Sequence, residues 1–75
     1  GKVDEAIGAF HRALQIKPDC TEAHSSLGDV LSDLGRLDEA IGHYRQALLA
    51  DPENAHVHCN LGVAMVRKGK LNEAE

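Results

Sequence analysis

Residues 21–54, TEAHSSLGDVLSDLGRLDEAIGHYRQALLADPEN, are one complete copy of a unit that recurs along this chain at an offset of 34 residues. The preceding segment shares many positions with this copy: Gly1, Asp4, Glu5, Ala6, Ile7, Gly8, Ala13, Leu14 and Pro18 recur as Gly35, Asp38, Glu39, Ala40, Ile41, Gly42, Ala47, Leu48 and Pro52. The following segment does so too: His24, Leu27, Gly28 and Gly35 recur as His58, Leu61, Gly62 and Gly69. A fixed period of about 20 to 50 residues is typical of stacked supersecondary units, none of which buries its apolar face alone. We therefore expect the function on a surface of the stack and not in a catalytic cleft.

The first half of the unit predicts a helix over residues 21–34. Its small and apolar residues share one helical face, at i, i+3, i+4 and i+7: His24, Leu27, Gly28 and Leu31. Asp19 and Glu22 have the spacing of a capping box at the start of this helix, and Gly35 predicts a left-handed stop at its end.

The second half predicts a helix over residues 37–50, which Pro52 ends because proline has no amide hydrogen to donate. The buried side of this helix is formed by Leu37, Ala40, Ile41, Tyr44, Ala47 and Leu48. The same patterns predict helices at 3–16 and 55–68. Connections of about 2 to 5 residues make neighbouring helices antiparallel, so we expect an all-α fold.

Four glycines lie inside the predicted helices, where glycine costs about 1 kcal/mol relative to alanine. Gly28 and Gly62 share the buried face, so a close approach of a neighbouring helix is expected at both. Gly8 and Gly42 fall on the solvent side and should only weaken their helices.

The sequence resembles the tetratricopeptide repeat over its whole length, on the positions Leu27, Gly28, Ala40, Tyr44, Ala47 and Pro52. The resemblance implies antiparallel helix pairs that stack into a right-handed α-solenoid. Residues 1–20 would be the second helix of a partial repeat, 21–54 a complete repeat and 55–75 a further partial repeat. The sequence departs from the family where large aromatic residues are preferred, since His24 and His58 stand there. We expect both histidines to be partly buried packing residues and not metal ligands.

In that family, the first helices of successive repeats line a concave groove that binds a peptide or an extended segment of a partner protein. The resemblance carries this role to the groove positions of helices 21–34 and 55–68: Glu22, Ser25, Ser26, Asp29, Asp33, His56, Cys59, Asn60, Val63 and Arg67. Equivalent positions should stack side by side, with Asp33 near Arg67 and Glu22 near His56. A merely solvated helix face is the alternative.

The segments HSSLG at 24–28 and HCNLG at 58–62 also look like repeats of the nucleocytoplasmic O-linked N-acetylglucosamine transferases. In those repeats, an asparagine just before the leucine forms a ladder along the groove, and its amide can pair with any peptide backbone. Asn60 matches the ladder position, and Ser26 departs from it. The substrate-recognition part of such a glycosyltransferase is therefore an alternative function.

The composition disfavours other partners. The chain carries 12 Asp+Glu against 8 Lys+Arg, a formal net charge of −4, without a basic run, so nucleic acid and membrane surfaces are not expected to bind. Cys20 and Cys59 occupy different repeat positions, which favours free thiols in a reducing compartment such as the cytoplasm. No cofactor or metal is expected, and neither is an enzyme, because adjacent candidate groups such as His24 and Ser25 point apart on a helix.

A self-stacking structural segment is the remaining alternative. The helix at 3–16 has no preceding first helix, so Ile7, Phe10 and Leu14 have an incomplete set of partners, and Leu61 and Met65 are similarly under-covered. The start of one molecule is then complementary to the end of another, in a head-to-tail contact.

Overall fold

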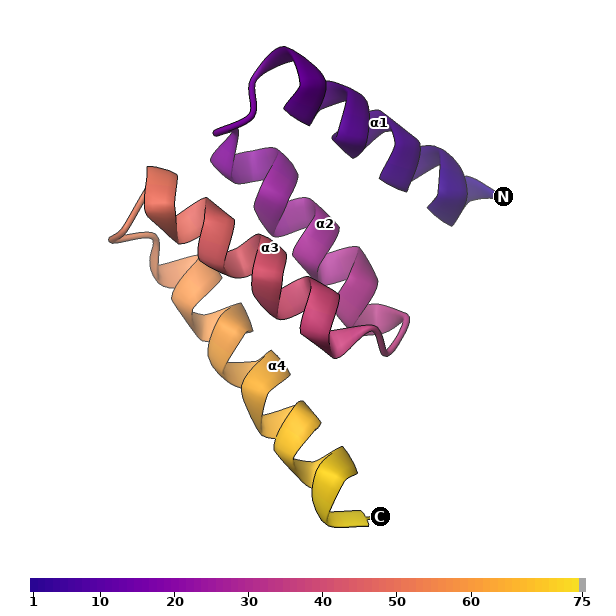
Figure 1. Cartoon of the computed structure of the whole chain (residues 1–75), viewed down its shortest axis with the longest axis vertical. Coiled ribbons are helices and arrows are strands. Elements are labelled where there is room, and N and C mark those ends of the chain that lie inside the picture. The colour runs from indigo at the N-terminus through magenta and orange to yellow at the C-terminus, as the bar shows by residue number, and fades with distance from the viewer. Residues whose placement is uncertain (75) are drawn as a thin grey trace.

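The computed structural model describes residues 1–74, and it describes side-chain surroundings through Lys70. Its helices follow one another along the chain (Figure 1): α1 Lys2–Ile16, α2 Thr21–Asp33, α3 Leu37–Ala50 and α4 Ala55–Ala74. No strand occurs within residues 1–74, so the prediction of an all-α fold is confirmed.

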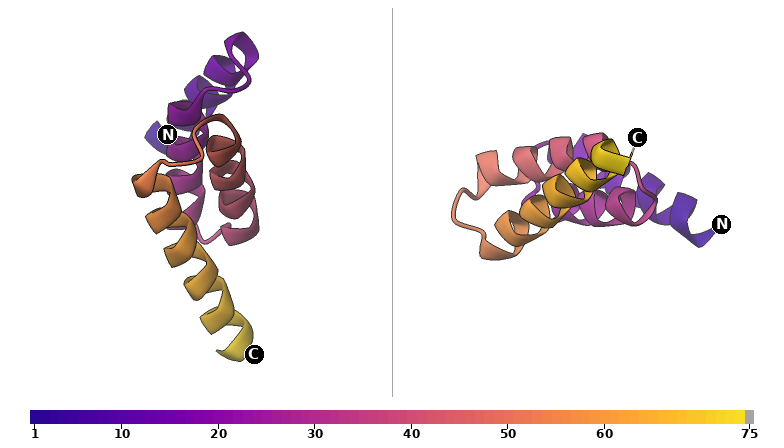
Figure 2. Two further views of the ribbon diagram at one scale, coloured as in Figure 1. Left: turned by 90° about the vertical axis from the view of Figure 1, so that its left-hand side faces the viewer. Right: turned by 90° about the horizontal axis from the view of Figure 1, so that it is seen from below.

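α3 is the central helix, because it packs against both α2 and α4, whereas α1 packs on α2. α2 and α4 touch each other at few points. In Figure 2, α3 and α4 lie side by side, joined at one end by the short connection over residues 51–54. The Cα atoms extend over 39 × 33 × 14 Å, so the helices form a thin slab with two broad faces.

The turn between α2 and α3 is built on Gly35, as predicted. Gly35 has φ +80°, a backbone conformation that residues with a side chain rarely adopt. Its N–H donates to the carbonyl of Ser32 at 3.0 Å, and the N–H of Arg36 donates to the carbonyl of Leu31 at 2.9 Å. These two bonds form a Schellman motif, which ends α2 and reverses the chain.

The equivalent glycine, Gly69, does not end its helix. α4 runs unbroken from Ala55 to Ala74, so the predicted end at residue 68 is wrong. A turn at Gly69 would forfeit helical hydrogen bonds, and that loss is offset only when a returning helix buries an apolar face. After Gly35, the returning helix is α3, which is 14 residues long and packs against α2. The described residues after Gly69 form no returning helix, and continuing through a glycine costs only about 1 kcal/mol. Glu75, the last residue of the predicted partial repeat 55–75, lies outside the described residues.

Cys20 and Asn54 are equivalent in the repeat, yet they start their helices differently. Asn54 caps α4, because its Oδ1 accepts a hydrogen bond from the Val57 N–H at 3.0 Å. Cys20 is the N-cap residue of α2, where no side chain makes a capping bond. The predicted capping box of Asp19 and Glu22 is therefore wrong. Its register fails by one residue, because α2 begins at Thr21 and Asp19 precedes the N-cap.

The core forms where α3 packs between α2 and α4. Tyr44, Leu27 and Val57 are its largest fully buried side chains. A Cβ added at Gly28 would stand only 2.5 Å from Cε1 of Tyr44. The absence of a side chain at Gly28 therefore lets the Tyr44 ring lie against α2, which confirms the predicted close approach.

The other three glycines of the predicted helices, Gly8, Gly42 and Gly62, lie in open space. A Cβ at Gly62 would meet nothing within 4 Å, so the close approach predicted there is wrong. Within the described residues, no helix covers that side of α4 as α3 covers α2. Gly8 and Gly42 are exposed with nothing near their added Cβ, which agrees with the prediction that they face solvent.

The two repeat-equivalent histidines make the same hydrogen bond in different surroundings. Nε2 of His24 lies 2.9 Å from the Pro18 carbonyl, and Nε2 of His58 lies 2.7 Å from the Pro52 carbonyl. Because a carbonyl only accepts, each Nε2 carries the hydrogen and ties its helix to the preceding loop. His24 is 8% exposed, as expected of a packing residue. The same prediction is wrong for His58, which is exposed, since no helix among the described residues covers it.

Candidate functional site

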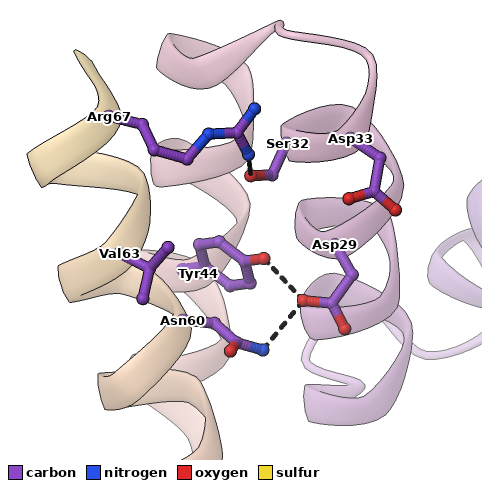
Figure 3. A pocket seen from close by; sticks show the side chains of 7 residues that line it. All are labelled: Asp29, Ser32, Asp33, Tyr44, Asn60, Val63 and Arg67. Atoms are coloured by element: carbon purple, nitrogen blue, oxygen red, sulfur yellow. Dashed lines mark hydrogen bonds between the residues drawn. The ribbon is translucent and has the colours of Figure 1, made fainter. Parts of the chain in front are cut away.

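A hollow between α2 and α4, with α3 behind it, is the candidate functional site. We call it the α2–α4 hollow, and its lining residues are shown in Figure 3: Asp29, Ser32, Asp33, Tyr44, Asn60, Val63 and Arg67. Its volume is about 340 Å³. Side chains from three helices therefore meet at one concave surface, although α2 and α4 make few direct contacts.

Asp29 is the centre of the hydrogen bonds in this hollow. Its Oδ1 accepts from the Tyr44 hydroxyl at 2.5 Å and from Asn60 Nδ2 at 2.9 Å. Figure 3 shows both donors converging on this single oxygen. Its other oxygen, Oδ2, lies 3.9 Å from Nε2 of His56. Asp29 thus joins α2 to α3 and α4 at once, while its side chain remains 45% exposed.

Tyr44 reaches the hollow from the core. Burial raises the pKa of its hydroxyl above the ordinary value, and the hydrogen bond to Asp29 and the charge of that carboxylate raise it further. The hydroxyl therefore stays protonated at neutral pH. It remains a hydrogen-bond donor that holds Asp29 in place.

The Asn60 amide has its orientation fixed by its neighbours. Since an ionised carboxylate only accepts, the group that faces Asp29 must be the NH₂ of Asn60. The same nitrogen lies 3.1 Å from Nε2 of His56, which acts as acceptor in the neutral ring. The carbonyl oxygen of Asn60 is then the part of the amide that remains for other contacts.

Arg67 lies two helical turns beyond Asn60 on α4. Its Nη1 donates to Oγ of Ser32 at 2.8 Å, which is the second side-chain bond between α2 and α4. Asp33 lines the same hollow, so it shares this region with Arg67 as expected. The bonded partner of Arg67 is however Ser32, because that hydroxyl lies on the side of α2 that turns toward α4.

The hollow unites half of the groove residues that the sequence indicated: Asp29, Asp33, Asn60, Val63 and Arg67. Other predicted positions lie beside it. His56 contacts Asp29 and Asn60, so its expected neighbour Glu22 is replaced by these two. Glu22 instead lines a separate depression with Phe10 of α1.

The remaining predicted groove residues are Ser25, Ser26 and Cys59. Oγ of Ser25 donates to the Glu22 carbonyl within its own helix at 3.2 Å, and Ser26 is half-buried. Cys59 is an exposed free thiol. These side chains are outside the hollow.

Sequence reasoning missed Tyr44 and Ser32 as parts of the site. Tyr44 belongs to the buried face of α3, and periodicity marks it only as core. One signal was available: Tyr44 replaces Phe10 of the preceding repeat, and a buried tyrosine hydroxyl normally has a polar partner. Ser32 had no comparable signal, because its bond to Arg67 depends on how α2 and α4 are arranged in space.

The described residues hold neither a cluster of metal-ligand side chains nor a membrane-spanning helix. No three His, Cys, Asp or Glu side chains there are grouped as metal ligands. In the same part of the chain, every helix is too short or too polar to cross a membrane.

Two family models match this chain, one described as "Tetratricopeptide repeat" over residues 1–48 and one as "TPR repeat" over residues 28–69. The chain belongs to the tetratricopeptide repeat family. Such repeats are typically non-catalytic modules that mediate protein–protein interactions. No curated protein matches the chain. The likeness to transferase repeats therefore gains no support beyond the two short segments that suggested it.

Proposed function

We propose that this chain is a protein-interaction module whose α2–α4 hollow binds an extended segment of a partner protein. The observation that carries the proposal is the bonding of Asp29 to Tyr44 and Asn60, which fixes polar groups from three helices around one concave surface. Side chains held in place before binding lose less entropy when a partner arrives.

The lining of the hollow supports an extended peptide as the ligand. The Asn60 carbonyl and the free N–H groups of Arg67 match the donors and acceptors of a peptide backbone. Val63 is 52% exposed and offers an apolar contact between them. In this proposal, Ser25, Ser26, Glu22, His56 and Cys59 continue the binding surface along the two helices.

A peptide selection with mapping by NMR tests this proposal. Random dodecapeptides are displayed and selected on the immobilised chain, and the selected peptides are titrated into labelled protein. We expect shifts at α2 and α4, and at least a several-fold loss of affinity in Asn60→Ala. Gln46→Ala, an exposed change on α3 outside the hollow, is the matched control. Binding that is weakened only by Gln46→Ala, or shifts confined to the other face, would contradict the proposal.

The apolar surface of α4 supports a second proposal, self-association. Met65 is 49% exposed, whereas its repeat equivalent Leu31 is buried by α3. A helix with the apolar pattern of α3 fits this surface. α1 has that pattern, since Ile7 and Phe10 are the equivalents of Ile41 and Tyr44. Burying one such side chain contributes about 1.5–3 kcal/mol. Several of them together can offset part of the free-energy cost of association, which is about 4–15 kcal/mol.

Sedimentation equilibrium tests this second proposal. We expect the mass of the 75-residue chain to rise with concentration and Met65→Lys to abolish the rise. A chain that stays monomeric up to millimolar concentration would rule it out.

A further inference from the structure

The polar groups of the α2–α4 hollow are mainly hydrogen-bond acceptors. The NH₂ group of Asn60 donates to Asp29 at 2.9 Å and lies 3.1 Å from Nε2 of His56, so only the carbonyl oxygen of Asn60 is left for a ligand. An unconstrained asparagine would offer a donor and an acceptor together. Asp29 and His56 occupy the donor group of Asn60, so Asn60 can recognise a ligand only as a hydrogen-bond acceptor.

Two carboxylates add to this acceptor surface. Oδ2 of Asp29 has only the distant contact to His56 at 3.9 Å, and half of the side chain is open to solvent. Asp33 lines the same hollow and is exposed, and no hydrogen bond or ion pair joins it to another residue within the described part of the chain. Asp29 and Asp33 are four residues apart on α2, so their like charges face the same side and repel each other.

One cationic side chain balances these groups in part. Arg67 is turned toward Ser32, to which its Nη1 donates at 2.8 Å. Its remaining N–H groups can take a backbone carbonyl of a ligand. The hollow thus has two negative charges against one positive, within a chain whose formal net charge is −4.

We infer that the hollow selects a partner segment with a lysine or arginine side chain, which donates to the Asn60 carbonyl, Oδ2 of Asp29 and the carboxylate of Asp33. This inference rests on the proposed function, and charge complementarity carries it. A cation relieves the repulsion between the two carboxylates. Its head group carries several N–H donors for the acceptors that line the hollow, whereas an acidic side chain would add to the repulsion.

Four pools of blocked decapeptides test the inference, with all positions randomised except a central Lys, Arg, Gln or Glu. Binding of each pool is measured at low salt by the shift of the Asn60 side-chain amide signal. We expect the Lys and Arg pools to bind about three- to tenfold more tightly than the Gln pool, with the difference shrinking in salt. Asp33→Asn should reduce that preference, whereas Glu53→Gln, which removes a charge from an exposed residue outside the hollow, should keep it.

Each other result has one meaning. If Gln and Glu pools shift Asn60 as strongly as the Lys pool, the inference is overturned while the proposed function stands. If Asp33→Asn and Glu53→Gln alter the preference equally, overall charge explains it and the inference is again overturned. If no pool shifts any signal of α2 or α4, the proposed function fails and the inference fails with it. Circular dichroism of both variants confirms that each remains helical.

Discussion

α2 and α4 occupy the same place in the repeat and share key residues, but they differ in what covers them. Leu27 of α2 is fully buried, and its equivalent Leu61 of α4 is only partly buried. Gly28 receives the Tyr44 ring, whereas no neighbouring atom of the described residues lies within 4 Å of a Cβ added at Gly62. The repeated residues mark where a helix can be buried. Whether burial happens depends on the second helix of the same repeat: α3 covers α2, and no described helix covers α4 in that way.

Leucine truncation should give the largest difference between the two helices. Leu27→Ala leaves a cavity in a closed site and should lower the free energy of unfolding by about 2–5 kcal/mol. Leu61→Ala removes a side chain that is already in contact with water, and should cost clearly less. Urea unfolding measured by circular dichroism compares the two. Equal losses would mean that α4 is as well packed as α2.

Alanine at the two glycines should act in opposite directions. Gly28→Ala forces the buried Tyr44 ring to move, so we expect a loss of about 1–3 kcal/mol in the free energy of unfolding. Gly62→Ala meets open space and replaces a poor helix former, so a gain of about 1 kcal/mol is expected. The shift in urea midpoint gives the sign. Stabilisation by Gly28→Ala would show that the ring can give way without cost.

The N-cap positions offer a smaller test. Asn54→Ala removes the bond to the Val57 N–H and should lower the free energy of unfolding by about 1 kcal/mol. Cys20→Asn places the same residue at the equivalent position of α2 and should raise it by a similar or smaller amount. Thermal unfolding of both variants checks this. If Cys20→Asn has no effect, the start of α2 lacks the geometry that Asn54 uses.

The smallest expected effect is a pH dependence of the free energy of unfolding that comes from His43. Nδ1 of His24 lies 3.1 Å from Nδ1 of His43, and the His11 ring lies 6.3 Å from that of His43 between centroids. Burial lowers the pKa of His43 below the ordinary 6.5, the charges of His24 and His11 lower it further, and Glu39 opposes them.

As the pH falls through about 6.5, the unfolded chain takes up a proton at His43 before the folded chain does, so the free energy of unfolding decreases. Above that pH this contribution is fully present. His43→Gln should flatten the decrease between about pH 7 and pH 5, and His58→Gln should leave it unchanged. If only His58→Gln changed the pH dependence of the free energy of unfolding, the assignment of this dependence to His43 would be wrong. Urea midpoints at several pH values measure it.

Most of the fold could be predicted from the sequence because its signals are local. The bounds of α3 agree with the predicted 37–50, and Gly35 ends α2 through a backbone conformation that glycine favours. The predicted stop at Gly69 failed because a glycine permits a turn without requiring one. The turn forms only where a returning helix stabilises it, and that depends on distant residues.

The candidate site was predictable in part for the same reason. Helical phase identifies residues such as Asp29, Asn60 and Arg67 that face one side of α2 and α4. It contains no information about a bond between two helices, so it could not show that Tyr44 and Asn60 share one oxygen of Asp29. The orientation of the Asn60 amide, which decides what it can bind, follows only from that shared oxygen.

The few links between α2 and α4 also have a mechanical meaning. Asp29–Asn60 and Ser32–Arg67 bridge two helices that touch at few points, so these links help to set the angle between successive units. Both bonds are only partly buried, so water can replace a partner in them at less cost than in a packed core. Under a pulling force, this joint should stretch while the helices stay intact. A stack of such units would behave as a soft spring, and a partner lodged in the joint would stiffen it.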